Sequence, residues 1–197
     1  AKERTFEQVV FLLLFGELPS RDQERELLRQ ISRYRKLDDS LAEVLEKIPG
    51  DANPMDVLRT ATSFISHLHP EPASSLYPSS SLRLLGALPS VLGYWLSFTT
   101  QQVRIATDSK NEEEIIAHHL LRVLRSNRSV SPLELKAMDA TLILYAEHDY
   151  NASTFAARIT ASTQSDMYSC ITTGIGTLKG NLHGGANEAA LDLISSI

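Results

Sequence analysis

The chain has 197 residues, a formal net charge of −5, 43% hydrophobic residues and a single cysteine, Cys170. This length allows a substantial core, and the acidic balance with scattered basic residues excludes a nucleic-acid-binding protein. One cysteine excludes a disulfide framework or a cysteine-based zinc site, and the longest apolar stretch, residues 9–15, is too short to span a bilayer. We therefore expect a soluble cytoplasmic protein without a membrane partner.

Helix-start and helix-stop patterns divide the first third of the chain. Thr5-Phe-Glu-Gln8 and residues 20–23 both have the spacing of a capping box, in which two side chains satisfy free backbone N–H groups. Gly16 ends the apolar run after the first box, and Asn53 is an N-cap residue followed by proline at the first helical position. The expected helices cover residues 5–15, 20–36, 39–48 and 53–68.

The remaining two thirds predict one loop and further helices. Residues 69–81 are so rich in proline and serine that they predict a loop. Ser131-Pro-Leu-Glu134 joins a capping box to an N1 proline and begins a largely apolar helix over 132–147. We expect this helix to be buried on most sides, as a core helix or an interface helix. The other expected helices cover residues 82–100, 111–125 (entered at Asp108 or Ser109), 152–164, 166–178 and 185–197.

No run of residues shows the two-residue alternation of a half-buried strand, so the sequence predicts an all-α fold. We expect residues 1–197 to form one helical domain. The chain starts at Ala1 inside a helix entrance and stops at Ile197 inside an apolar run, whereas domain ends usually lie in polar segments. We therefore expect it to be a piece of a longer protein.

Two histidines stand in segments that depart from the helical pattern. Glu147-His148-Asp149 follows the apolar helix, and Asn151 then caps a helix whose first N–H groups are suited to an anion. Further on, glycines flank His183 within residues 180–187, which lets a ligand approach the main chain. A histidine on such a turn can donate a hydrogen bond to a substrate oxygen or transfer a proton.

Structural explanations compete with these functional ones. His148 can simply end a helix, and the glycines can make a tight connection between helices. A metal site of His148, Asp149 and His183 is conceivable, although no helical spacing supports it, and we expect no metal. Arg59 can pair with a buried acid or bind a substrate carboxylate. The remaining candidates are read as structural: His118, His119, Cys170 and the Gly174-x-Gly176 pair, whose glycines permit close helix packing.

Three segments resemble the citrate synthase family. They are Tyr145-Ala-Glu-His148-Asp-Tyr-Asn151-Ala-Ser-Thr-Phe155, Ser165-Asp-Met-Tyr168 and Gly176-Thr-Leu-Lys-Gly180-Asn-Leu-His183-Gly-Gly-Ala-Asn187. The resemblance covers nearly the whole chain and is weakest between residues 69 and 110. Within the family, the first two segments are closer to 2-methylcitrate synthases.

The resemblance implies a Claisen-type condensation of oxaloacetate with propionyl-CoA, and also with acetyl-CoA, on an all-helical large domain. His183 matches the catalytic histidine that hydrogen-bonds the thioester oxygen, and His148 matches the histidine that binds oxaloacetate. Asn151, Gly184 and Asn187 match positions that support the pocket. The family also implies a homodimer and no cofactor, because coenzyme A enters as part of the substrate.

The sequence departs from the family pattern at two points. Asn181 stands where the family usually has proline, which leaves the geometry of the turn open. The family's second catalytic histidine, its general-base aspartate and its small domain have no counterpart in these 197 residues, so we expect the chain alone to be inactive. The alternatives are a citrate synthase that mainly uses acetyl-CoA, a non-catalytic helical binding module and a metal-dependent hydrolase.

Overall fold

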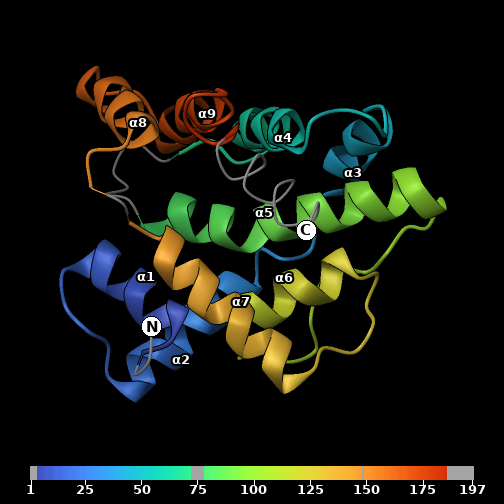
Figure 1. The fold of residues 1–197 in the computed structure, drawn as a ribbon, viewed down its shortest axis with the longest axis horizontal. Coiled ribbons are helices and arrows are strands. Elements are labelled where there is room, and N and C mark those ends of the chain that lie inside the picture. Colours follow the sequence, from blue (N-terminus) through green and yellow to red (C-terminus); the bar gives the residue numbers. More distant parts are fainter. Residues whose placement is uncertain (1–3, 72–77, 148, 186–197) are drawn as a thin grey trace, which may run out of the picture. The chain divides into compact units, whose positions relative to one another are not determined.

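The computed structural model describes residues 4–71, 78–147 and 149–185. These residues form nine α-helices and no β-strand, which confirms the all-α prediction (Figure 1). The helices are α1 (Phe6–Phe15), α2 (Arg21–Ser32), α3 (Asp39–Glu46), α4 (Pro54–Leu68), α5 (Pro78–Gln101), α6 (Ile116–Leu124), α7 (Pro132–Tyr145), α8 (Ala152–Ser162) and α9 (Met167–Leu178).

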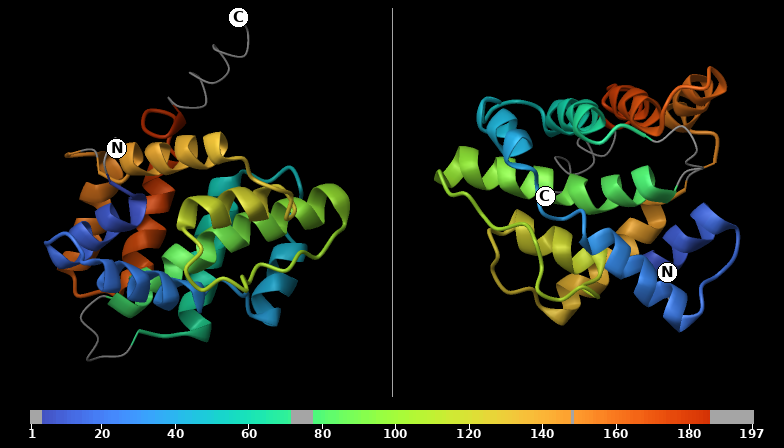
Figure 2. Two further views of the ribbon diagram at one scale, coloured as in Figure 1. Left: turned by 90° about the horizontal axis from the view of Figure 1, so that it is seen from below. Right: turned by 180° about the vertical axis from the view of Figure 1, so that it is seen from behind.

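The helices belong to two compact units that were not predicted from the sequence. Unit 1 spans residues 1–52 and 73–148 and contains α1–α3 and α5–α7. Unit 2 spans residues 53–72 and 149–197, so α4 joins α8 and α9 across a long stretch of chain. Within unit 2, α9 lies between α4 and α8 and packs against both (Figures 1 and 2).

Most of the predicted helix starts are confirmed by their cap geometry. Ser20 and Ser131 each form a complete capping box, and the Asn53 side chain accepts from the Met55 N–H. Thr5 accepts from the Gln8 N–H, but the Gln8 side chain donates to Glu24 instead of completing a box. Local sequence therefore determines these starts even where a tertiary contact changes one partner.

The start of α6 was predicted wrongly, because a residue distant in sequence caps it. The helix begins at Ile116 rather than at residue 111 after an entry at Asp108 or Ser109, and its N-cap residue provides no side-chain hydrogen bond. Instead, Glu7 Oε1 of α1 accepts from the Ile116 N–H at 2.8 Å. A tertiary contact thus satisfies the free N–H group that a local cap would otherwise bind.

The core of unit 1 lies among α1, α2, α5, α6 and α7. Close approach of α5 and α6 requires glycine at position 93, since a Cβ atom there would lie 2.5 Å from the Val123 Cβ. The cluster of buried apolar side chains consists of Phe6, Val10, Phe11, Leu27, Ile31, Leu82 and Ile116.

Helix α7 corrects the expectation of burial on most sides. None of its residues is fully buried, and the side chains of Leu133 and Leu144 are 77% and 71% exposed. One side does pack on the unit 1 core, through Leu142 and Ile143, and the helix contacts α1 and α6. A core position within this chain was therefore wrongly predicted, because apolar composition marks a helix without a strongly polar face but does not say how many neighbours surround it. An interface position stays a prediction.

A buried ion pair joins the end of α2 to the start of α6. Arg35 Nη1 lies 2.8 Å from Glu114 Oε2, and both side chains are almost completely buried. Glu114 Oε1 also accepts from Arg122 Nε at 3.0 Å and contacts His118 Nδ1 at 2.5 Å. Burial raises the pKa of Glu114, but the hydrogen bonds from Arg122 and His118 outweigh burial and hold this pKa at about 2.

His119 has the structural role expected from the sequence. Arg122 Nη2 donates to its Nδ1 at 3.0 Å, so the proton of the neutral ring is assigned to Nε2, which donates to Ser90 Oγ at 3.0 Å. Burial, followed by the charge of Arg35, lowers the pKa of His119 to about 3. The ring is therefore neutral near pH 7 and links α5 to α6.

Glu7 predicts a measurable pH dependence of stability. Burial raises its pKa above 4.5, although the hydrogen bond from Ile116 opposes this change, and its Oε2 atom has no hydrogen-bond partner. Because the folded-state pKa is raised, ionisation of Glu7 lowers the free energy of unfolding as the pH rises from about 4.5 through that pKa. Glu7→Gln is neutral and can still accept from Ile116.

The stability of Glu7→Gln relative to the native chain should therefore increase between pH 4.5 and 7.5. Urea denaturation of both proteins at each pH measures this difference. A difference in unfolding free energy that is the same at every pH would reflect only the new amide group. Such a result contradicts the prediction.

Candidate functional site

The turn that carries His183 is folded back onto the end of α9. The His183 N–H donates to Gly180 O at 2.8 Å, and the Gly184 N–H donates to Leu178 O at 2.9 Å. A Cβ atom at position 184 would lie only 2.2 Å from Leu178 O. Glycine is therefore required here by the approach of two backbone segments, and the absence of proline at position 181 is compatible with a closed turn.

The imidazole of His183 meets the N-terminus of α8. The Ser153 N–H donates to His183 Nε2 at 3.3 Å, and Ser153 Oγ lies 2.9 Å from the same nitrogen. The backbone N–H needs Nε2 as an acceptor, whereas the Ser153 hydroxyl, which donates to Asn151 Oδ1, can only accept from the ring. The two contacts therefore fix the position of the ring through Nε2 and leave Nδ1 for a ligand oxygen.

Asn151 joins the same hydrogen-bonded group. Its Oδ1 atom caps α8 by accepting from the Thr154 N–H at 2.7 Å, and Ser153 Oγ lies 2.7 Å from that oxygen. The structure thus brings Asn151 and His183 together through Ser153, which the sequence analysis did not single out. A serine two residues after an N-cap asparagine was the available signal, because this spacing places it in the first helical turn.

Two N–H groups at the N-terminus of α8 therefore already have hydrogen-bond partners. The N–H groups of Ser153 and Thr154 bind His183 and Asn151 respectively. The expected anion site would need these same donors. In this arrangement, the helix end orients a histidine instead.

The other candidates have separate outcomes. His148 and Asn187 lie outside the described residues, so the structure places only Asn151, His183 and Gly184 of the predicted site. In the part of the chain that the structure describes, no group of three or more His, Cys, Asp or Glu side chains is arranged to hold a metal ion. Cys170 is buried, as expected, and burial raises the pKa of its thiol.

Arg59 pairs with an acidic side chain of its own helix. Its Nη2 atom lies 2.8 Å from Asp56 Oδ1, one turn earlier on α4. Arg59 thus pairs with an acid, although that acid is partly exposed rather than buried. Its side chain also runs along α9, since a Cβ atom at Gly176 would lie 3.8 Å from Arg59 Cδ. This is an ordinary contact distance, so the packing at Gly176 does not itself demand glycine.

Comparison with known proteins identifies the family. The sequence profile of the citrate synthase C-terminal domain matches residues 1–197. The chain belongs to the citrate synthase family. It is 47% identical over 197 residues to the 2-methylcitrate synthase of Shewanella oneidensis, covering 100% of this chain and 52% of that protein. It is 38% identical to the citrate synthase of Mycolicibacterium smegmatis, covering 97% and 50% respectively.

Solved citrate synthases share the fold. The enzyme from Thermotoga maritima matches with a TM-score of 0.81 and 28% identity, over 99% of this chain and 50% of its own. The enzyme from Thermoplasma acidophilum matches with a TM-score of 0.83 and 24% identity, over 98% and 50%, and supports the fold alone. This citrate synthase family chain spans about half the length of the curated relatives it matches. No helix among its described residues has the length and apolar character of a membrane span.

Proposed function

We propose that this chain provides the enol-stabilising and oxaloacetate-binding histidines of a 2-methylcitrate synthase. The observation that carries the proposal is the placement of the His183 ring, which is held through Nε2 at the start of α8 and so leaves Nδ1 to donate to a substrate oxygen. A hydrogen-bond donor in a fixed position is what a developing oxyanion requires. The family resemblance of the surrounding residues supports the choice of substrate.

The proposed reaction forms one carbon–carbon bond and then breaks the thioester. A base removes a proton from the carbon next to the thioester carbonyl, and negative charge moves to the thioester oxygen. His183 donates its Nδ1–H to that oxygen. The enol carbon attacks the ketone carbon of oxaloacetate, whose carbonyl His148 polarises. The ketone oxygen takes up one proton, which balances the proton removed by the base, and becomes a hydroxyl. Water then hydrolyses the thioester and releases coenzyme A.

Propionyl-CoA is the proposed acyl donor because the relatives at 47%, 39% and 40% identity include 2-methylcitrate synthases. Citrate synthases at 38% and 32% identity keep acetyl-CoA as the alternative. The two donors differ by one methylene group, which a pocket typically discriminates by about 1–3 kcal/mol.

We further propose a cytoplasmic homodimer without a bound cofactor, in which coenzyme A takes part only as substrate.

The first experiment measures thiol release by the full-length protein from propionyl-CoA and from acetyl-CoA, with and without oxaloacetate. Release that depends on oxaloacetate supports a condensing enzyme, and the ratio of the two rates identifies the acyl donor. Absence of release supports the alternative of a non-catalytic helical module. Loss of activity on chelation would instead favour the metal-dependent hydrolase, whereas a synthase is expected to be indifferent to chelators.

His183→Ala should lower kcat by at least about 10²-fold, because it removes the donor to the developing oxyanion. His67→Ala is the matched control, since His67 is an exposed histidine on α4. Steady-state kinetics of both variants with propionyl-CoA and oxaloacetate checks the expectation. Equal activities of the two variants would contradict the role of His183.

A further inference from the structure

We infer that Asp56 is a positioning residue for His183 and acts through Lys179. The inference rests on the proposed function, because it assumes that the placement of the His183 ring matters for turnover. Neither Asp56 nor Lys179 was singled out from the sequence. They come from different segments of unit 2, and α4 and α9 bring them together.

The contact between them is a close ion pair. Lys179 Nζ lies 2.5 Å from Asp56 Oδ2, and the two side chains are 38% and 31% exposed. The other carboxylate oxygen of Asp56 lies 2.8 Å from Arg59 Nη2. The hydrogen bond from Lys179 lowers the pKa of Asp56, so the carboxylate is charged at neutral pH. Asp56 is thus held between two cations, which restricts its rotamer.

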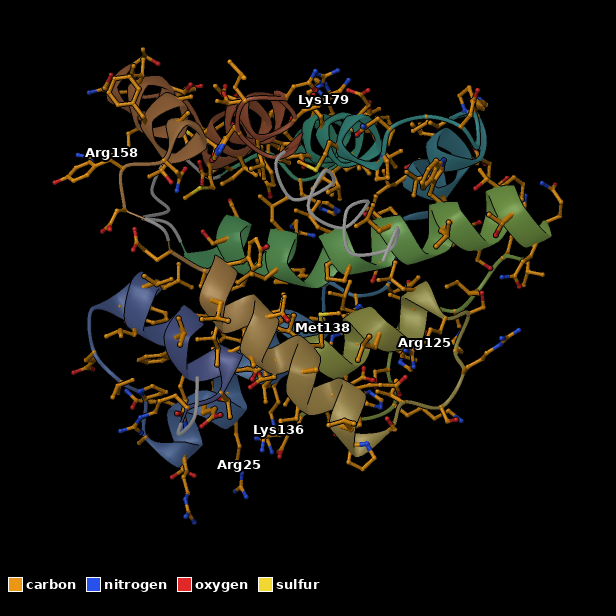
Figure 3. All side chains as sticks on the ribbon, viewed as in Figure 1. Arg25, Arg125, Lys136, Met138, Arg158 and Lys179 are labelled. Carbon is orange, nitrogen blue, oxygen red and sulfur yellow. The ribbon has the colours of Figure 1, made fainter. Side chains whose placement is uncertain are left out.

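Lys179 lies between the last helical residue of α9 and the turn that carries His183. It is the C-cap residue of α9, and its N–H donates to Ile175 O at 3.0 Å. The residue before it accepts from Gly184, and the residue after it accepts from His183. A side chain fixed at this position therefore restrains both ends of the turn. Figure 3 shows Lys179 at the end of α9 that lies beside α4.

The turn then has three attachments in unit 2. Backbone hydrogen bonds hold it to the end of α9, the contact between His183 and Ser153 holds it to α8, and the Lys179–Asp56 pair holds it to α4. With only the first two attachments, no side chain of the turn segment itself is tied to α4. The third attachment provides that contact.

The inference predicts an effect on turnover without a matching effect on stability. An exposed ion pair contributes little to the free energy of unfolding, because water and salt screen it. A displacement of a catalytic group by about 1 Å can nevertheless cost on the order of 10²-fold in rate. Loss of Asp56 should therefore change kcat more than it changes folding or the KM for oxaloacetate.

The test uses Asp56→Asn, Lys179→Met and the double variant in the full-length protein. We expect each single variant to lower kcat by about two- to fivefold with an unchanged KM for oxaloacetate, because an exposed pair contributes little free energy and can shift the population of the competent turn by no more than that. The double variant should be no slower than either single variant, because both remove the same interaction. Asp22→Asn is the matched control, since Asp22 is an exposed aspartate in the first turn of α2. It should leave kcat unchanged.

A second readout does not depend on catalysis. The ¹⁵N resonances of the His183 ring report which nitrogen carries the proton. They should show the Nδ1–H form in the native protein and a mixture of both tautomers in Asp56→Asn. Unchanged resonances, an unchanged kcat in Asp56→Asn, or additive effects in the double variant would each overturn the inference. If His183→Ala retains full turnover, the proposed function fails, while the resonances still test the positioning by Asp56.

Discussion

Glu114→Ala is expected to lower the free energy of unfolding of unit 1 by about 3–5 kcal/mol, because it leaves the charge of Arg35 buried without its carboxylate. The Arg35 side chain is fully buried, and its guanidinium also donates to the main-chain oxygen of residue 114. Truncation would keep that backbone contact but remove the only ion pair that the structure gives Arg35 among the described residues. Arg122 and His118 would lose the same carboxylate.

Glu113→Ala provides the matched control. This neighbouring carboxylate is 39% exposed and pairs with Arg25 and Arg29 at the surface, so its loss should cost less than about 1 kcal/mol. Urea denaturation of the two variants side by side measures the difference. An equal loss of unfolding free energy in the two variants would contradict the prediction. It would show that the buried Arg35–Glu114 pair stabilises the fold no more than the surface pairs of Glu113 do.

Titration gives an independent check on Glu114. Its folded-state pKa of about 2 lies below the ordinary value of 4.5, so its contribution to stability is complete above about pH 4.5 and decreases as the pH falls toward 2. The stability difference between the native chain and Glu114→Gln should shrink over this interval. This direction is opposite to the one expected for Glu7.

Gly184→Ala is expected to reduce turnover of the full-length enzyme by on the order of 10²-fold, because it forces open the turn that presents His183. A Cβ atom 2.2 Å from Leu178 O cannot be accommodated by side-chain motion, since both neighbours are backbone. The hydrogen bond from Gly184 to Leu178 must break, and the adjacent His183 ring must move away from Ser153.

Gly185→Ala is the control for this prediction. A Cβ atom at that position would lie 3.7 Å from the Asn181 side chain, which is an ordinary contact, so the variant should keep near-normal activity. Steady-state kinetics of both variants, with circular dichroism to verify their helical content, separates a local change from unfolding. Similar kcat values for the two variants would contradict the required backbone approach at Gly184.

Local signals predicted much of the fold, and long-range contacts account for the errors. Ser20, Asn53 and Ser131 cap helices as expected, because a cap depends on residues within one turn of each other. The start of α6 depends on Glu7, 109 residues away, so no local pattern could reveal it. The exposure of α7 and the division into two units likewise depend on which helices pack together.

Local signals also predicted part of the candidate site, and a long-range contact accounts for the rest. Glycines around His183 and the N-cap pattern at Asn151 marked two segments that the structure brings together, and the family resemblance implied roles for their residues. Neither signal could show that Ser153 lies between them, because that contact joins the start of α8 to the turn after α9. Asp56 was harder still to find, since its link to the turn passes through a lysine on another helix.

The composition of unit 2 from two distant segments also bears on how the protein folds during synthesis. Helix α4 ends at Leu68, whereas α9, against which it packs, begins at Met167. Ribosomes add about 5–20 residues per second, so α4 leaves the tunnel on the order of 5–20 s before its partner exists. Closing so long a loop adds little further entropy cost but slows the search for the native contact. Unit 2 is therefore completed late, and the face of α4 that packs on α9 has no partner in the interval.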